Sequence, residues 1–186
     1  MTDLPITHRF PRPDRPLTDK ETRLYALADE ALVALENAFL KAEQFYQTTF
    51  PRPELNFKQR GKIAGSARPN SWEIRLNPIL FLENSEAFLK EVIPHEAAHL
   101  VTARRYGRVK PHGKEWQFVM NNVMGLPARV THRFETTSVT GKIYPYRCQC
   151  QTHALTIIRH NRILRGGEYR CVKCKSLLIY LENETK

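Results

Sequence analysis

An H-E-x-x-H segment, His95-Glu96-Ala97-Ala98-His99, constrains the fold of this chain more than any other feature. Residues four apart lie on one face of an α-helix, so His95 and His99 are placed to bind the same zinc ion. Glu96 lies between them and is placed to act on a water molecule at that ion. The segment therefore predicts a helix that carries a catalytic zinc site, with Glu96 as the catalytic residue.

The residues around this segment favour a helix. Apolar side chains recur at three- and four-residue steps between Phe88 and Val101. Gly107 follows the last turn and is the expected C-cap. Pro94 has no N–H for the carbonyl group four residues earlier. We therefore expect a kink there, or a new helix that starts at about residue 94.

The expected zinc site needs one more ligand, because a catalytic zinc ion takes three protein ligands and keeps a fourth position for water. The metzincin pattern is excluded, since it requires a glycine and a histidine where this chain has Thr102 and Arg105. The remaining candidates are His112 and Glu115, at the start of a second predicted helix. A turn at residues 107–111 would fold this helix back onto the first, and we favour His112 as the third ligand.

The preceding part of the chain predicts one long helix and a small sheet. Residues 1–16 contain four prolines and three arginines, which predicts a disordered basic lead. A capping-box pattern at residues 18–21 starts a long amphipathic helix, and short strands follow within residues 55–76. The last of these strands is the one we expect to offer its backbone to an extended substrate. Residues 17–140 are thus expected to form an α+β domain with a small antiparallel sheet.

Composition limits the class of protein. The chain is 41% hydrophobic and 26% charged, as globular proteins in solution are. No apolar run approaches the length of a membrane span, and the first residues lack the apolar core of a signal peptide. We therefore expect a cytoplasmic monomer with no membrane partner.

All four cysteines lie near the C-terminus, which in a cytosolic chain favours a metal site over disulfides. Cys171 and Cys174 have the C-x-x-C spacing of half a zinc ribbon. The other half is irregular, because one residue separates Cys148 from Cys150, whereas Cys150 and His153 have the two-residue spacing. The ligands are therefore the four cysteines or Cys150, His153, Cys171 and Cys174, and we slightly favour a set that contains both Cys150 and His153.

Residues 141–182 are expected to form a β-rich zinc ribbon around these ligands. Residues 155–159 and 163–164 have the pattern of a hairpin, which is the usual body of a ribbon. So small a segment has little core and needs a metal ion to hold it together. With the histidine site, we expect two zinc ions per chain.

Positive charge is concentrated in the C-terminal half. The chain has a formal charge of +10, and residues 101–175 alone have fifteen Lys or Arg and three Glu, a formal charge of +12. Such a surface attracts phosphate backbones, so we expect DNA, single- or double-stranded, as a partner. An anionic membrane is less favoured, since no basic amphipathic helix is evident. The candidate nucleic-acid contacts are Arg159, Arg162, Arg165, Arg170 and Lys173.

Several segments, in this order along the chain, resemble the bacterial SprT family. They are residues 84–88, 94–100, 107–109, 111–116, 145–148 and 159–162, and the resemblance extends from about Pro51 to Leu178. It implies a zincin-like metalloprotease domain with His95, His99 and His112 on zinc and Glu96 as the catalyst. The family is similar in its metal domain to Spartan, a eukaryotic DNA-dependent protease that degrades proteins crosslinked to DNA. DNA–protein crosslink repair is therefore a candidate role, with protein as the substrate.

The alternative is a nucleic-acid-binding zinc protein whose histidine site is structural. A structural site fills its fourth position with another protein ligand, and Glu115 is the residue placed to do so. The intact Glu96 argues against this interpretation, because a structural site has no use for a general base.

Overall fold

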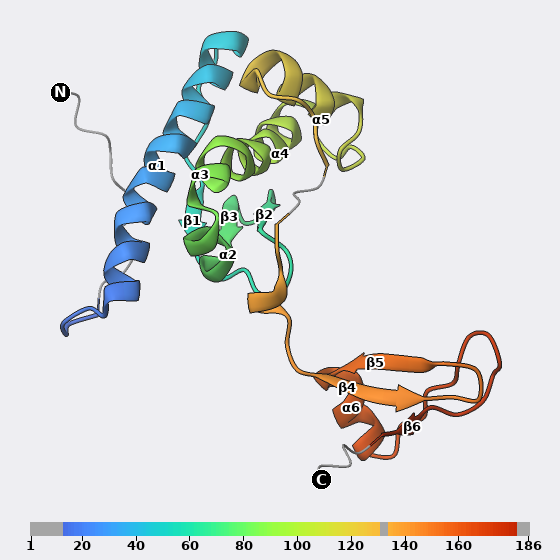
Figure 1. Cartoon of the computed structure of the whole chain (residues 1–186). Coiled ribbons are helices and arrows are strands. Elements are labelled where there is room, and N and C mark those ends of the chain that lie inside the picture. Colours follow the sequence, from blue (N-terminus) through green and yellow to red (C-terminus); the bar gives the residue numbers. More distant parts are fainter. Residues whose placement is uncertain (1–12, 131–133, 182–186) are drawn as a thin grey trace. The chain divides into compact units, whose positions relative to one another are not determined.

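The computed structural model describes residues 13–130 and 134–181, so most of the predicted basic lead lies outside the described residues. The chain divides into two compact units, one ending at Val139 and the other starting at Thr140. Both combine helices with a small sheet, as Figure 1 shows, so the fold is α+β. Within the described residues, no helix is long and apolar enough to span a membrane.

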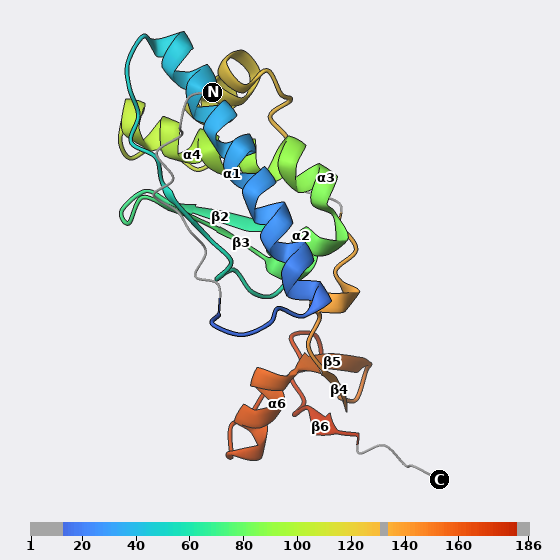
Figure 2. The same cartoon turned by 90° about the vertical axis from the view of Figure 1, so that its left-hand side faces the viewer.

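Helix α1 (Asp19–Tyr46) is the longest element of the first unit and begins at the predicted capping box. The Thr18 hydroxyl accepts a hydrogen bond from the Glu21 N–H, and the Glu21 carboxylate accepts one from the Thr18 N–H. One apolar face of α1 is buried, from Leu27 to Ala42. This face packs across α4 (Ile93–Tyr106), the helix with the H-E-x-x-H segment (Figure 2).

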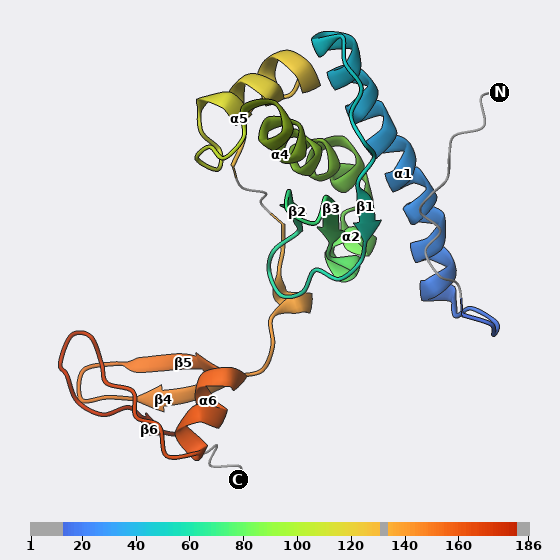
Figure 3. The ribbon, with the colours of Figure 1, turned by 180° about the vertical axis from the view of Figure 1, so that it is seen from behind.

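The sheet of the first unit is mixed, and the expectation of an antiparallel sheet was wrong. Its strands β1 (Glu54–Asn56), β2 (Gly65–Arg68) and β3 (Glu73–Leu76) have the order β1-β3-β2. After β1 at one edge of the sheet, the chain forms β2 at the opposite edge and then β3 between the two. Strand β3 therefore runs antiparallel to β2 but parallel to β1. The helix α4 lies over this sheet beside β2 (Figure 3).

A widened helical turn precedes the H-E-x-x-H helix. After α2 (Pro78–Glu83) and α3 (Ser85–Ala87), residues Phe88–Val92 form a π-helical turn, and α4 starts at Ile93. Pro94 thus falls in the first turn of a new helix, where its missing N–H costs little. The predicted helix start at about residue 94 is confirmed. The helix ends at Gly107, whose φ of 72° favours glycine.

The chain then folds back, as predicted, into a second helical stretch. It consists of α5 (Lys114–Phe118) and the π-helical residues Val119–Met124, and Gly125 ends it in the left-handed conformation. A 3₁₀ turn at Thr137–Val139 closes the unit. The core between α1, α4, the sheet and this stretch contains large, fully buried side chains, among them Phe39, Phe81, Phe88, Ile93 and Trp116.

Up to residue 181, where its description ends, the second unit contains a three-stranded antiparallel sheet and one helix. Strands β4 (Ile143–Arg147), β5 (Thr152–Thr156) and β6 (Ile179–Tyr180) have the order β5-β4-β6. Residues Ile157–Leu164, where we expected much of a hairpin, form helix α6. That expectation was wrong. The interpretation that no basic amphipathic helix is evident was also wrong, because α6 exposes Arg159 and Arg162 and buries His160.

The buried side chains of α6 explain the helix. His160 and Ile163 are three residues apart and face the sheet, a spacing that suits a helix and not a strand. The His160 ring stacks on Tyr144 with centroids 3.6 Å apart, and its Nδ1 lies 2.9 Å from the Tyr146 hydroxyl. These contacts between distant residues decide the local conformation.

Candidate metal centres

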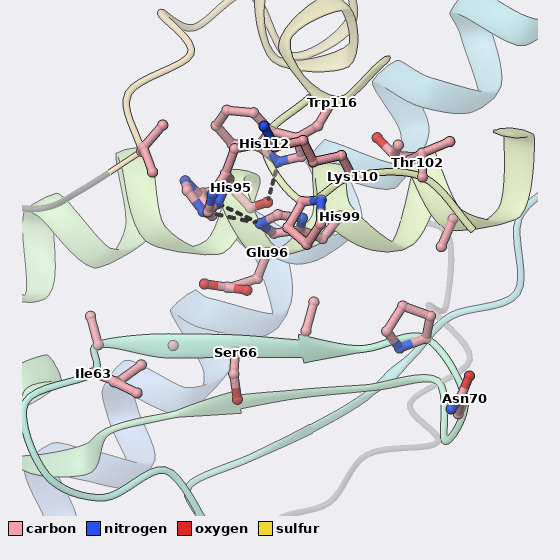
Figure 4. A pocket seen from close by; sticks show the side chains of 18 of the residues that line it. Ile63, Ser66, Asn70, His95, Glu96, His99, Thr102, Lys110, His112 and Trp116 are labelled. Atoms are coloured by element: carbon pink, nitrogen blue, oxygen red, sulfur yellow. Dashed lines mark hydrogen bonds between the residues drawn. The ribbon is translucent and has the colours of Figure 1, made fainter. Parts of the chain in front are cut away.

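Three imidazole rings converge at a cleft of the first unit (Figure 4). His95 and His99 come from consecutive turns of α4, and His112 comes from the turn before α5. The Nε2 atoms of His95 and His99 are 3.2 Å apart, and that of His112 is 3.2 Å from the first and 3.0 Å from the second. This cluster could bind a metal ion.

The separations fit a tetrahedral zinc ion. Zn–N bonds of about 2.0–2.1 Å at tetrahedral angles put two ligand nitrogens about 3.4 Å apart. Burial and the neighbouring His112 lower the pKa of His99 to about 4, and burial also lowers the pKa of His112. Both rings are therefore neutral at pH 7, which is the form that binds metal ions.

The backbone places His112 opposite the two α4 histidines. His112 has a φ of 56°, in the left-handed region that a non-glycine residue enters at a cost of about 1 kcal/mol or more. A hydrogen bond from Gln117 Nε2 to the His112 carbonyl oxygen, 3.0 Å long, ties this residue to the following helix. Among the described residues, Glu115 is not part of the cluster.

Trp116 supports all three histidines. Its side chain is fully buried, and its ring centroid lies 4.7 Å from that of His95, 5.3 Å from that of His99 and 4.6 Å from that of His112. The sequence pattern did not identify Trp116 as part of the site. The one sequence feature that could have indicated this role is the position of Trp116, four residues after the candidate ligand His112. Its contacts with the three histidine rings depend on how the second helix folds back onto α4.

Glu96 points from α4 toward strand β2 (Figure 4). The strand approaches closely at Gly65, where an added Cβ atom would lie 3.1 Å from both Cγ and Oε1 of Glu96. Burial raises the pKa of the Glu96 carboxyl to about 7, although a hydrogen bond from the Ala67 backbone opposes this shift. No motif in the sequence indicated that Gly65 and Ala67 belong to the site.

The cleft above Glu96 has a volume of about 1350 Å³. The segment from Lys62 to Ala67 lines one side, and α4 with the following turn lines the other. We expected the strand at residues 71–76 to offer its backbone to the substrate, and this expectation was wrong. Strand β3 is the central strand of the sheet and has no free edge. Strand β2 is an edge strand and lines the cleft together with the histidines. Within the described residues, Thr102 has the only buried side-chain oxygen or nitrogen without a hydrogen-bond partner, and it too lines this cleft.

The second cluster joins two turns of the second unit. Cys148 and Cys150 follow β4, while Cys171 and Cys174 come from a turn after α6, and the four Sγ atoms lie within 4.8 Å of one another. Such a cluster could bind a metal ion. The separations of 3.4 Å between Cys148 and Cys150 and 3.7 Å between Cys150 and Cys171 approach the value of about 3.8 Å that Zn–S bonds of about 2.3 Å require.

His153 does not belong to this group. Its Nε2 atom lies 3.3 Å from the Cys148 Sγ, outside the four-sulfur cluster. The structure therefore gathers the four-cysteine set, and not the set with His153 that the spacing slightly favoured. Hydrogen bonds from the Ser176 hydroxyl and backbone lower the pKa of Cys174 to about 5, which favours the thiolate that binds metal ions.

The basic residues predicted to contact nucleic acid are all exposed on the second unit. The guanidinium groups of Arg159 and Arg162 each lie 6.0 Å from the centre of the Tyr169 ring. Arg170 is partly neutralised by Glu168, 3.2 Å away. Arg165 follows α6, and Lys173 lies between Cys171 and Cys174.

Two histidines of the H-E-x-x-H helix and a third from the turn before α5 form a cluster that could bind a metal ion, beside a buried glutamate. This site defines the class of metal-binding proteins with an H-E-x-x-H helix. The SprT-like family model matches residues 35–135, and the chain belongs to this family. It is 50% identical to Protein SprT of Escherichia coli strain K12 over 162 residues, which cover 86% of this chain and 98% of that protein. It is 49% identical to Protein SprT of Cronobacter sakazakii over 155 residues, 83% of this chain and 93% of the relative. No solved structure matches.

Proposed function

We propose that this protein is a zinc-dependent metalloprotease that hydrolyses peptide bonds, with a zincin-like catalytic domain at residues 17–140 and a zinc ribbon at residues 141–182. The observation that carries the proposal is the triangle of histidine Nε2 atoms beside the buried Glu96. Three ligands leave a fourth position for water or substrate. Since Glu115 is outside the cluster among the described residues, the structure offers no support for a closed structural site.

The proposed chemistry depends on Glu96 as general base and general acid. Zinc, when bound, polarises the peptide carbonyl and acidifies water. Glu96 accepts a proton from the attacking water and later donates it to the leaving amine. A carboxyl pKa raised to about 7 suits both steps, because the group can gain and lose the proton near neutral pH.

Strand β2 is the proposed guide for the substrate. It lies at the edge of the sheet and lines the cleft next to Glu96. An extended peptide can add to such an edge by backbone hydrogen bonds, with its scissile bond near the histidines. This mode needs little side-chain recognition, and the proposed substrate class is therefore unfolded or extended protein.

We further propose that the ribbon binds its zinc ion through the four cysteines and brings the protease to DNA. The exposed Arg159 and Arg162 on either side of Tyr169 support this role, because cations beside an aromatic ring suit phosphates and bases. DNA–protein crosslink repair is the candidate process. Anionic vesicles are a necessary control, since α6 is a basic helix with Ile158 exposed.

A protease assay with and without single-stranded DNA tests the proposal. Glu96→Gln should retain zinc and fold but lose proteolysis by at least ~10²-fold, as expected for removal of a general base. Glu115→Gln is the matched control, because it makes the same chemical change on the neighbouring helix and should retain activity. Equal cleavage by the Glu96 variant and wild type would refute the catalytic role. Loss of zinc in the Glu115 variant would favour the structural alternative.

A further inference from the structure

The turn between α4 and α5 has an unusual density of exposed positive charge. Five cations lie within eleven residues and are all exposed: Arg104, Arg105, Arg108, Lys110 and Lys114, which we call the basic turn. Within the described part of the chain, none of them forms an ion pair. Unpaired like charges so close together repel one another, which is a cost that a bound anion would remove.

Four aromatic rings lie next to the basic turn, where the ends of α1 and α4 meet α5. This aromatic cluster consists of Phe45, Tyr46, Tyr106 and Phe118. The Phe45 ring centroid lies 5.0 Å from that of Tyr46 and 5.9 Å from that of Phe118, and the hydroxyls of Tyr46 and Tyr106 are 3.2 Å apart. Phe45 is 48% exposed, while Tyr106 and Phe118 are each 40% exposed, so these rings present flat apolar surface to solvent.

One arginine connects the two features. The Arg105 guanidinium lies 5.4 Å from the centre of the Tyr46 ring, a cation–π contact. At the other side of the basic turn, Arg104, Arg108 and Lys110 line the cleft that contains the histidine cluster. Exposed cations of the basic turn therefore lie both at the cleft and beside the aromatic cluster.

We propose that the basic turn and the aromatic cluster together form a binding surface for single-stranded nucleic acid on the first unit. Backbone phosphates would contact the cations, and unpaired bases would stack on the exposed rings. A short acidic peptide in the cleft would reach only the cleft-lining cations and would leave Arg105 and the aromatic cluster unused. The surface is distinct from the ribbon site proposed above, and it does not depend on whether the protein hydrolyses peptides.

The charge component is tested by fluorescence anisotropy with a labelled single-stranded DNA oligonucleotide of mixed sequence. Every sample is the full-length protein with Arg159→Ala, Arg162→Ala and Arg165→Ala. These substitutions reduce binding of the oligonucleotide to the ribbon equally in all samples. The test variant adds Arg105→Ala, Arg108→Ala and Lys114→Ala. The control adds Lys20→Ala, Lys58→Ala and Lys90→Ala, three exposed lysines elsewhere on the first unit, which remove the same net charge.

The test variant should bind at least ~10-fold more weakly than the control at low salt. Its plot of log affinity against log salt should be flatter by about two units, since each lost phosphate contact on a single strand removes about 0.7. Equal affinity and equal slope for the two variants would overturn the proposal. Tighter binding of poly-glutamate than of the oligonucleotide, lost on the same substitutions, would overturn it in favour of an acidic polypeptide.

The aromatic component needs its own variants. Phe45→Leu with Phe118→Leu keeps apolar volume but removes the flat rings, so folding should be preserved and thermal unfolding should confirm this. Binding of the single strand should fall at least ~5-fold, since stacking on an aromatic ring contributes this much or more per base. Unchanged affinity in the folded double variant would overturn the stacking role, and with it the preference for a single strand.

Discussion

At the residue scale, the proposed chemistry depends on how close a neighbouring strand can approach Glu96. Gly65 is the closest point, and an added Cβ atom would lie 3.1 Å from Glu96 Cγ, Glu96 Oε1 and Val92 Cγ1. Few real Cβ contacts are so short, so a side chain at this position must displace the carboxylate or the strand. The absence of a side chain at Gly65 thus leaves room for the Glu96 carboxylate, the proposed general base, in its present position.

Gly65→Ala should therefore impair activity more than folding. We expect a fall of at least ~10-fold in kcat/KM, because misplacing a catalytic group by a fraction of an ångström weakens proton transfer. Gly141→Ala is the matched control, since an added Cβ atom there meets nothing within 4 Å. Steady-state cleavage of an unfolded protein substrate, together with thermal unfolding, measures both effects. Full activity in a well-folded Gly65 variant would contradict the geometry.

At the scale of elements, a bridging arginine joins α1 to the segment that leads into β1. Arg52 donates hydrogen bonds of 2.7 Å to both oxygens of Glu36 and one of 2.6 Å to Glu43, both on α1. The three side chains are only 20–25% exposed, so the ion pairs are shielded better than pairs in full contact with water. Arg52 thereby fixes the start of the sheet against the longest helix.

Arg52→Ala should destabilise the protein by about 1–3 kcal/mol at pH 7, because it leaves two neighbouring carboxylates without their partner. The Arg52 side chain lowers the pKa of Glu43, so its contribution is fully present above the unfolded value of about 4.3 and is lost as the pH falls through the folded value. The difference between wild type and variant in urea unfolding should shrink below about pH 4. A difference that grows on acidification would refute this assignment.

At the scale of the whole molecule, the two units have separate ligand clusters, one of three histidines and one of four cysteines. We propose that each cluster binds one zinc ion, which gives two zinc ions per chain. Because no residue is shared, loss of one ion should leave the other in place.

This independence can be measured by elemental analysis of variants. His112→Ala should empty or weaken the histidine site and spare the ribbon, and Cys171→Ser should do the reverse. Each variant thus serves as the control for the other. A fully loaded wild-type protein with one zinc ion would contradict the two-site proposal.

Local patterns predicted the elements that neighbouring residues can form by themselves. The capping box at Thr18, the helix start near Pro94 and the helix end at Gly107 all follow from hydrogen bonds or dihedral angles within a few residues. The juxtaposition of His95 and His99 follows in the same way from the helical repeat.

Only the tertiary structure decided what depends on contacts between distant residues. It brought His112, and not Glu115, to the α4 histidines, and it placed Gly65 under Glu96. It also grouped the four cysteines, and it made α6 a helix by stacking His160 on Tyr144. The order of the strands, which makes β1 and β3 parallel, likewise depends on how the chain crosses the sheet. Periodicity along a sequence records which side chains share a face, but it does not record which face of another element they will meet.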